Sequence, residues 1–265
     1  MELWFSEYHS KDAKMSIRID KQYYSGQSEF QRIDVFESPE FGRFLTLDGI
    51  MMLTEKDEFI YHEMITHVAM ASNPDIKKVL VIGAGDGGTV RELTRYDTIE
   101  HIDMVEIDEE VVNVCRKYIP QTACKLDDPR VHLHFEDGLR YVRTKENCYD
   151  LIIVDSTDPF GPGEGLFTSE FYGNCYNALT ENGLFTPPDK NASKYCFSSP
   201  PALCTDRSAN TYPRITPNTI NADNTSIGTG TRCGSAPRRS LLFVRLSKYV
   251  TPREGKRHSA RGAKR

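Results

Sequence analysis

The sequence predicts an α/β protein with a small N-terminal antiparallel β-sheet domain, a larger parallel-sheet domain and an atypical, disordered C-terminal tail. Residues 16–53 repeatedly alternate apolar and polar side chains, as half-buried strands do. Residues 79–180 alternate short apolar strands with amphipathic helices, which indicates a parallel sheet covered on both faces. Residues 184–265 hold 8 of the 14 prolines and show no sustained period. The predicted segments are 1–55, 56–183 and 184–265.

The N-terminal sheet is predicted from stretches with a period of two. Residues 16–20 alternate in this way, and residues 30–36 do so again. Residues 43–47 run into Asp48-Gly49, a dipeptide typical of a hairpin turn, and residues 50–53 follow it. We therefore expect antiparallel strands here.

The period then changes to that of a helix over residues 58–71, which Pro74 ends. Tyr61 and His62 lie near one edge of the apolar stripe. The stripe consists of Phe59, Ile60, Met64, Ile65 and Val68.

Strands and helices alternate strictly through the larger domain, and ligands of such sheets bind at the carboxyl ends of the strands. Leu184-Phe185 could begin one more strand before Pro187. The strands are expected at 79–82, 102–106, 131–135 and 151–154, and the helices near 87–96, 109–118, 138–146 and 168–180.

A glycine-rich loop, residues 83–88, follows the first strand and completes the pattern G-x-G-x-x-G. Such a loop is typical of a Rossmann-like, class I methyltransferase-like nucleoside site, although a tight turn without a ligand has the same pattern. Asp86 places a carboxylate in the loop, which would repel a pyrophosphate and attract an ammonium or sulfonium group, unless it only caps the helix. The loop glycines are Gly83, Gly85, Gly87 and Gly88.

Acidic residues also follow the next two strands. Glu106 closes the second strand about twenty residues further on, where a carboxylate can accept hydrogen bonds from ribose hydroxyls. Asp137-Gly138 follows the third strand, where Asp137 could accept from an adenine amino group or could simply cap a helix. With Asp86, these residues favour an adenosine ligand that carries positive charge over a dinucleotide.

The fourth strand ends in Asp155-Ser156-Thr157-Asp158. Two carboxylates at the mouth of a parallel sheet are costly to desolvate without cationic partners, and a cationic substrate would supply them. A solvated turn before Pro159 is the alternative.

Composition narrows the class of protein. No run approaches the roughly 18–20 apolar residues of a membrane span, and the first residues lack a basic leader before an apolar stretch, so we expect a cytoplasmic protein. The seven cysteines contain no Cys-x-x-Cys pair, which favours free thiols, and we expect no metal. Residues 184–265 hold 15 of the 33 Lys and Arg against 4 of the 38 Asp and Glu, but without a stacking-aromatic pattern, so we expect no nucleic-acid partner.

The motifs resemble those of spermidine synthase, the polyamine aminopropyltransferase family, from about residue 2 to Gly183. The resemblance implies transfer of the aminopropyl group of decarboxylated S-adenosylmethionine to putrescine, giving spermidine and 5′-methylthioadenosine. It implies a homodimer or homotetramer and no cofactor besides the co-substrate. The matching motifs are Gln31, Asp48-Gly49, residues 57–64, residues 83–88, residues 105–108, Asp137-Gly138 and residues 155–163.

The resemblance also implies a role for each residue. Asp155 would be the general base, and His62 with Asp86 would hold the amino end of the aminopropyl chain. Tyr61 would orient the attacking amine, and Asp158 would bind it. Without the resemblance, His62 would be interpreted as a structural histidine and Gln31 as a surface residue. The other substrate-binding residues are Glu106 for ribose, Asp137 and Gly138 for adenine, Gln31 and Pro162 around the methylthioadenosine part, and Ser156 and Thr157.

The resemblance ends near Gly183. In the family the sheet continues there, and that region supplies acceptor-binding residues and much of the subunit interface, whereas here a basic tail follows. A frame change in the coding sequence near residue 184 would produce such a switch. Two alternatives stay open: a non-catalytic remnant that binds a nucleoside or a polyamine, and an S-adenosylmethionine-dependent methyltransferase. Asp155 and Asp158 disfavour the methyltransferase because an acidic pocket suits an amine acceptor.

Overall fold

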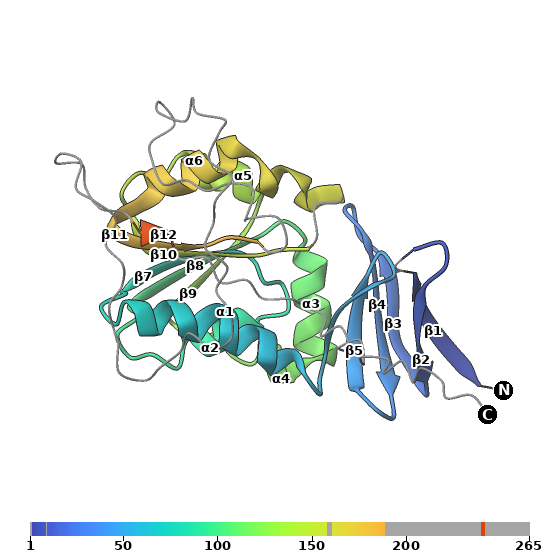
Figure 1. Cartoon of the computed structure of the whole chain (residues 1–265). Helices are drawn as coiled ribbons and strands as arrows, with labels where there is room; N and C mark the ends of the chain where they lie inside the picture. The colour runs from blue at the N-terminus through green and yellow to red at the C-terminus, as the bar shows by residue number, and fades with distance from the viewer. Residues whose placement is uncertain (1, 9, 158–160, 189–239, 242–265) are drawn as a thin grey trace, which may run out of the picture.

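The computed structural model describes residues 2–8, 10–157, 161–188 and 240–241. Figure 1 shows antiparallel strands of the N-terminal part beside a larger α/β part. In the larger part, α5 (Gly138–Arg143) and α6 (Ser169–Ala178) cover one face of the parallel sheet, and α1 (Glu58–Ser72) and α2 (Gly88–Leu93) cover the other. The predicted α/β architecture is confirmed. The expected disorder is wrong at the start of the tail, where residues 184–186 are buried in a strand of the sheet, and residues 189–239 and 242–265 lie outside this description.

The N-terminal part forms two antiparallel sheets. A two-stranded sheet pairs β1 (Leu3–Tyr8) with β2 (Lys14–Ile19). Asp48 and Gly49 form the predicted hairpin turn, with φ of 50° and 76°, the left-handed values that such turns need. The four-stranded sheet consists of β3 (Lys21–Gln27), β4 (Arg32–Ser38), β5 (Gly42–Leu47) and β6 (Ile50–Thr54).

The strands of the larger sheet are all parallel, in the order β12-β11-β10-β7-β8-β9. From β7, the strands β8 and β9 are added on one side of the sheet and β10 on the other, so the strand order reverses between β7 and β10. Ligands of open parallel sheets bind at such a point. The strands are β7 (Lys78–Gly83), β8 (His101–Glu106), β9 (Val131–Phe135), β10 (Tyr149–Asp155), β11 (Leu179–Thr186) and β12 (Ser240–Leu241).

Alternate residues of β7 are buried in separate cores. Val79 and Val81 pack with side chains of α1 and α2, and Leu80 and Ile82 pack with α5 and α6. This burial on both faces explains why the strand is apolar throughout. A third core joins β4, β5 and β6 to α3 (Glu109–Tyr118) and α4 (Pro120–Ala123), which fixes the N-terminal sheet against the larger one.

Helix α1 has nearly the predicted extent, and Ile65 of the apolar stripe is buried, but most of the stripe is not. Phe59, Ile60 and Met64 of the apolar stripe are 46%, 55% and 43% exposed. The buried side instead includes the polar side chains of Glu58 and His62. The helix therefore turns polar groups inward, which is explained below by the pocket that they line.

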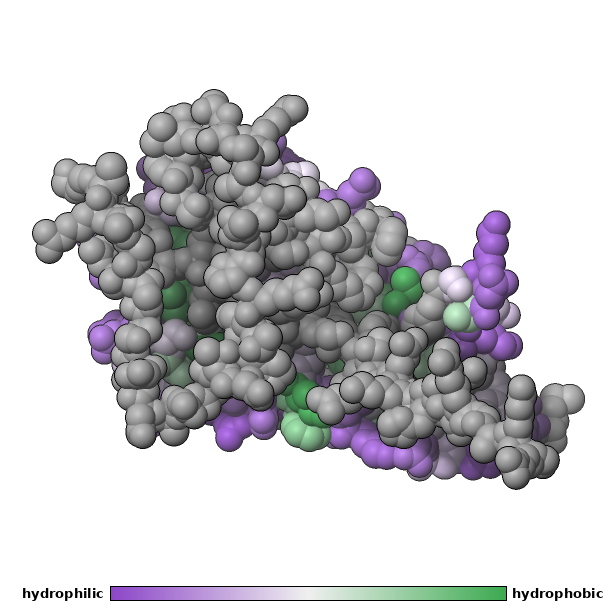
Figure 2. Space-filling model, viewed as in Figure 1, coloured by the Kyte–Doolittle hydropathy of each residue, from purple (hydrophilic) through white to green (hydrophobic). Residues whose placement is uncertain are grey.

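In the view of Figure 2, small hydrophobic spots appear beside hydrophilic side chains where described residues show between the grey ones. Among the helices of the described ranges, none is long and apolar enough to cross a membrane. The four cysteines within the same ranges carry free thiols.

Candidate active site

A pocket opens at the carboxyl ends of β7, β8 and β10, with an empty volume of about 990 Å³ that includes space open to solvent. Ligand pockets for small molecules fall in a similar range. Gly87 and Gly88 lie beside it at the start of α2, and Asp158 and the side chain of Pro162 lie outside the described residues. The predicted site residues that line it are Gln31, Tyr61, His62, Gly83, Gly85, Asp86, Glu106, Asp137, Gly138, Asp155, Ser156 and Thr157.

The glycine loop joins β7 closely to β10. Gly83 is paired with Asp155 in the sheet register, and the backbone N–H of Ala84 donates to the carbonyl oxygen of Asp155 at 2.8 Å. Gly83 has φ of +87°, and a Cβ there would lie 2.1 Å from that oxygen. The position therefore requires glycine both for its backbone conformation and for the lack of a side chain.

We expect Gly83→Ala to lower the unfolding temperature clearly and to weaken nucleoside binding at least tenfold, because the clash involves backbone that cannot move without separating β7 from β10. Thermal unfolding and calorimetry with 5′-methylthioadenosine would measure both effects. Gly173→Ala is the matched control, since nothing lies within 4 Å of a Cβ there and alanine favours its helix. If Gly83→Ala and Gly173→Ala had the same unfolding temperature and the same affinity for 5′-methylthioadenosine, the expectation would be contradicted.

Asp155, the predicted general base, is buried and held by two hydroxyl groups. The Tyr61 hydroxyl donates to Oδ1 at 2.8 Å, and the Thr89 hydroxyl donates to Oδ2 at 2.7 Å. Both carboxylate oxygens therefore have a fixed direction. Sequence reasoning missed Thr89; its place directly after the glycine loop is the signal that could have found it.

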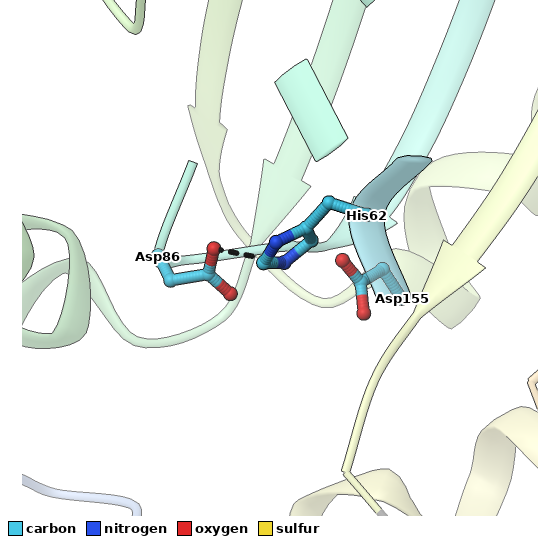
Figure 3. Close-up of side chains that lie close together, drawn as sticks. All are labelled: His62, Asp86 and Asp155. Carbon is cyan, nitrogen blue, oxygen red and sulfur yellow. Dashed lines mark ion pairs between the residues drawn. The ribbon is translucent and has the colours of Figure 1, made fainter. Parts of the chain in front are cut away.

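Figure 3 shows the ring of His62 between Asp86, with which it forms an ion pair, and Asp155. Its Nε2 is 3.2 Å from Asp86 Oδ1, and its Nδ1 is 2.6 Å from Oε2 of Glu58. Burial alone would lower the pKa of His62, but Asp86 and Glu58, with Asp155 nearby, outweigh burial and raise it to about 10. The side chain is therefore an imidazolium at neutral pH. Gly88 makes room for it, because a Cβ there would lie 2.3 Å from the ring.

Asp86 is fixed by the loop as well as by His62. Its Oδ1 accepts from the backbone N–H of Gly88 at 2.7 Å, at the start of α2, although the N-cap position itself is Gly87. The same carboxylate lines the pocket. The two roles are therefore compatible in one side chain.

Glu106 occupies the wall between β8 and α3. Its Oε1 accepts from the backbone N–H of Asp108 at 3.0 Å, and Gln31 Nε2 donates to Asp108 Oδ2 at 3.0 Å. The carboxyl is partly open to the pocket but otherwise enclosed by protein, and this burial, with the charges of Asp108 and Asp86, raises its pKa to about 7. A donor of hydrogen bonds would favour the ionised form.

Asp137 and Gly138 line the wall opposite the N-terminal strands. Asp137 Oδ1 accepts from the N–H of Leu139 at 2.8 Å and so caps α5, as the alternative interpretation predicts, while the residue still faces the pocket. A Cβ at Gly138 would lie 2.5 Å from a methyl group of Ile82. The apolar part of the lining, which sequence reasoning missed because strand alternation alone does not mark it, includes Leu45, Leu47, Met52, Leu53, Val111 and Leu166.

Two groups of side chains in the described ranges have possible ligand atoms within 4.8 Å of one another, as a metal site would. In the first, both ring nitrogens of His62 face carboxylates, and a protonated imidazole has no lone pair for a metal. In the second, Arg95 Nη1 lies 2.6 Å from a Glu92 oxygen and occupies it. The donor chemistry therefore favours ion pairs, and the absence of a metal stays a prediction. The groups are His62, Asp86, Asp155 and Glu63, His67, Glu92.

Comparisons with known proteins match both parts of the chain. The family model "Spermine/spermidine synthase domain" matches residues 58–196, and "Spermidine synthase tetramerisation domain" matches residues 3–55. The polyamine aminopropyltransferases of Alkaliphilus oremlandii (strain OhILAs) and Clostridium botulinum (strain Alaska E43 / Type E3) are 75% and 73% identical over 184 residues. These residues are 69% of this chain, and they span 65% of the length of each relative.

Solved structures of spermidine synthases are also similar to this chain. A crystal structure of spermidine synthase in complex with the transition state analogue AdoDATO has a TM-score of 0.68 and 50% identity, over 69% of this chain and 63% of that one. Spermidine synthase from Thermotoga maritima has a TM-score of 0.66 and 49% identity, over 69% of this chain and 62% of that one.

Proposed function

The chain belongs to the spermine/spermidine synthase family, and from this premise we propose that it transfers the aminopropyl group of decarboxylated S-adenosylmethionine to putrescine, giving spermidine and 5′-methylthioadenosine. The observation that carries the proposal is the gathering of Asp86, Glu106 and Asp155 around one pocket at the switch point of the sheet. Three acidic side chains there suit a reaction between two cations.

The proposed reaction is a displacement at carbon. The nitrogen of the acceptor amine attacks the carbon beside the sulfonium, the new N–C bond forms as the S–C bond breaks, and the sulfur leaves as a neutral thioether. Asp155 takes a proton from the amine, so that the attacking nitrogen has a free electron pair. Tyr61 and Thr89 fix the direction of that carboxylate.

The donor is proposed to lie along the other walls. Glu106 accepts from the ribose hydroxyls, Asp137 and Gly138 contact the adenine, and Asp86 pairs with the ammonium of the aminopropyl chain. This last pairing disfavours S-adenosylmethionine itself, because Asp86 would repel its carboxylate. Gln31, Ser156, Thr157, Pro162 and, for the acceptor amine, Asp158 complete the set that family membership supports.

Nucleoside binding without transfer is the second candidate. The observation that favours it is the 65% span of the relatives' length, since the matched segment leaves out the rest of those proteins. The first 166 residues contain every described wall of the pocket, so the donor site does not depend on the unmatched part.

We further propose that the chain forms homo-oligomers through its N-terminal strands. We also propose that it lies in the cytoplasm, where free thiols such as those of its described cysteines stay reduced. Leu3, Trp4 and Tyr8 of β1 are exposed, and they lie in the segment that matches a tetramerisation domain. Replacing Trp4 with serine should shift the molar mass measured by light scattering towards that of a monomer. An unchanged mass would remove this surface from the interface.

The test of the proposed function uses the full chain and two successive measurements. Calorimetry with 5′-methylthioadenosine reports the donor site, and spermidine formation from decarboxylated S-adenosylmethionine and putrescine reports transfer. Binding with turnover would support aminopropyl transfer, and binding without turnover would support the second candidate. No binding would contradict both.

A further inference from the structure

A chain of ion pairs runs from His62 through Glu58, which also lines the pocket, to Arg91. Glu58 lies one helical turn before His62 on α1, and both side chains are buried. Glu58 Oε2 is 2.6 Å from His62 Nδ1, while His62 Nε2 faces Asp86. Each ring nitrogen thus has a carboxylate to donate to, so the ring carries both protons.

Glu58 is in turn held by Arg91 of α2. The guanidinium donates through Nη1 to Oε1 at 2.8 Å and through Nη2 to Oε2 at 3.0 Å, which is a bidentate pair. Arg91 also donates to the carbonyl oxygen of Gln121 at 3.1 Å and to Glu92 Oε1 at 2.9 Å. Hydrogen bonds thus connect α4 and α2 through Glu58 to a carboxylate of the pocket.

The protonation state of His62 determines which hydrogen bonds its ring can form. A protonated imidazole has no lone pair, so it cannot accept a hydrogen bond from the ammonium of an aminopropyl chain. It can donate to Asp86, and its positive charge offsets the repulsion between the carboxylates of Asp86 and Asp155. His62 therefore acts on the substrate through Asp86.

We propose that Glu58 and Arg91 are positioning residues of this site: they hold His62 as a cation whose Nε2–H directs the carboxylate of Asp86 at the donor's ammonium. The proposal deepens the proposed function and rests on it. The raised pKa of His62 agrees with the geometry, and Glu58 has a lowered pKa because its hydrogen bonds to His62 and Arg91 outweigh burial, which alone would raise it.

Two ligands separate positioning from general structural support. 5′-Methylthioadenosine and decarboxylated S-adenosylmethionine share the adenosine part, but only the latter has the ammonium that Asp86 would pair with. The ratio of their dissociation constants therefore reports the contacts of the aminopropyl chain and the sulfonium, including the contact with Asp86, and cancels the titration of Glu106, which is proposed to contact the shared ribose.

We expect Glu58→Gln to reduce the preference for decarboxylated S-adenosylmethionine about tenfold at pH 9, the effect of losing one charge-assisted hydrogen bond, while 5′-methylthioadenosine binds normally. The loss should shrink towards pH 7. The variant removes one of the carboxylates that keep His62 protonated, so the ring would lose its proton as pH rises. The groups that face the ring in the parent chain are Glu58, Asp86 and Asp155, with Tyr61 beside it.

Glu92→Gln is the matched control, because Glu92 is also buried and also pairs with Arg91 but does not contact His62. Arg91→Lys keeps the positive charge but loses the bidentate geometry. The ratio of dissociation constants for this variant should lie between those of the parent chain and Glu58→Gln. It also provides a test if Glu58→Gln does not fold. An unchanged ratio in both Glu58→Gln and Arg91→Lys, equal loss of both ligands, or the same change in Glu92→Gln would overturn the proposal. If the parent chain binds neither ligand, the proposed function itself fails, and the positioning role fails with it.

Discussion

Asp155→Asn is expected to lower the rate of aminopropyl transfer by about 10³-fold while leaving 5′-methylthioadenosine binding within about twofold. Asparagine has the size of aspartate, and its amide can still bond to the hydroxyls of Tyr61 and Thr89, so the fold and the donor walls should persist. What the variant lacks is an acceptor for the proton of the attacking amine. Single-turnover formation of spermidine is the direct measurement.

Asp127→Asn provides the control for the Asp155 variant. It is the same chemical change at a side chain that is 84% exposed and pairs only with Arg116 among the described contacts. The control should keep the parent rate. A rate within tenfold of the parent for Asp155→Asn would show that another group removes the proton.

The second large effect concerns Glu106, where binding and stability should move in opposite directions. In Glu106→Gln we expect 5′-methylthioadenosine to bind about 10²-fold more weakly at pH 8, because an ionised carboxylate accepts stronger hydrogen bonds from two hydroxyls than an amide does. In the parent chain, affinity should fall below pH 7, since protonated Glu106 must first release its proton. The variant should bind independently of pH in this range.

The raised pKa of Glu106 also determines how the free energy of unfolding changes with pH. Burial raises the pKa of Glu106 from 4.5 to about 7, so the folded ligand-free chain binds more protons than the unfolded chain between these values, and stability falls as pH rises through this window. Glutamine avoids this loss. We expect the variant to gain about 1–3 kcal/mol at pH 8, less than the full shift implies because the pocket admits solvent, and nothing near pH 4.5.

Urea unfolding at the two pH values would measure the stability change. Glu109→Gln is the control, since that carboxylate is exposed on the first turn of α3. Stability that fails to rise in Glu106→Gln at pH 8 would contradict the raised pKa. Unchanged affinity would contradict the ribose contact.

Sequence patterns predicted the elements that are strongly apolar or end in a distinctive turn. Strands β7, β8 and β10 and the Asp48-Gly49 hairpin are of this kind. Strand β3 escaped prediction because its polar residues lie on a largely exposed surface, where alternation is weak. The buried face of α1 could not be predicted from apolar spacing, since the helix turns Glu58 and His62 inward to the pocket.

The candidate site was predicted residue by residue where a functional group follows a strand, as with Asp86, Glu106 and Asp155. Sequence reasoning missed Thr89, Glu58 and Arg91 because each of them contacts another side chain of the site, namely Asp155, His62 and Glu58, respectively. Their partners lie 66, 4 and 33 positions away in the sequence, respectively. Only a folded chain shows such contacts, although the spacing of Glu58 and His62 by one helical turn was a usable signal.

The glycine loop and Asp155, the proposed general base, lie at the ends of the adjacent strands β7 and β10, and this placement limits how far they can move relative to each other. Strand β7 is paired on both sides, and its interior residues are completely or almost completely buried, so its amides can exchange with solvent only when much of the domain opens. Asp155 and the loop from Gly83 are attached to the ends of these strands. The groups that would carry out the chemistry are therefore fixed to the slowest-exchanging part of the molecule, and local fluctuations at the periphery leave their spacing unchanged.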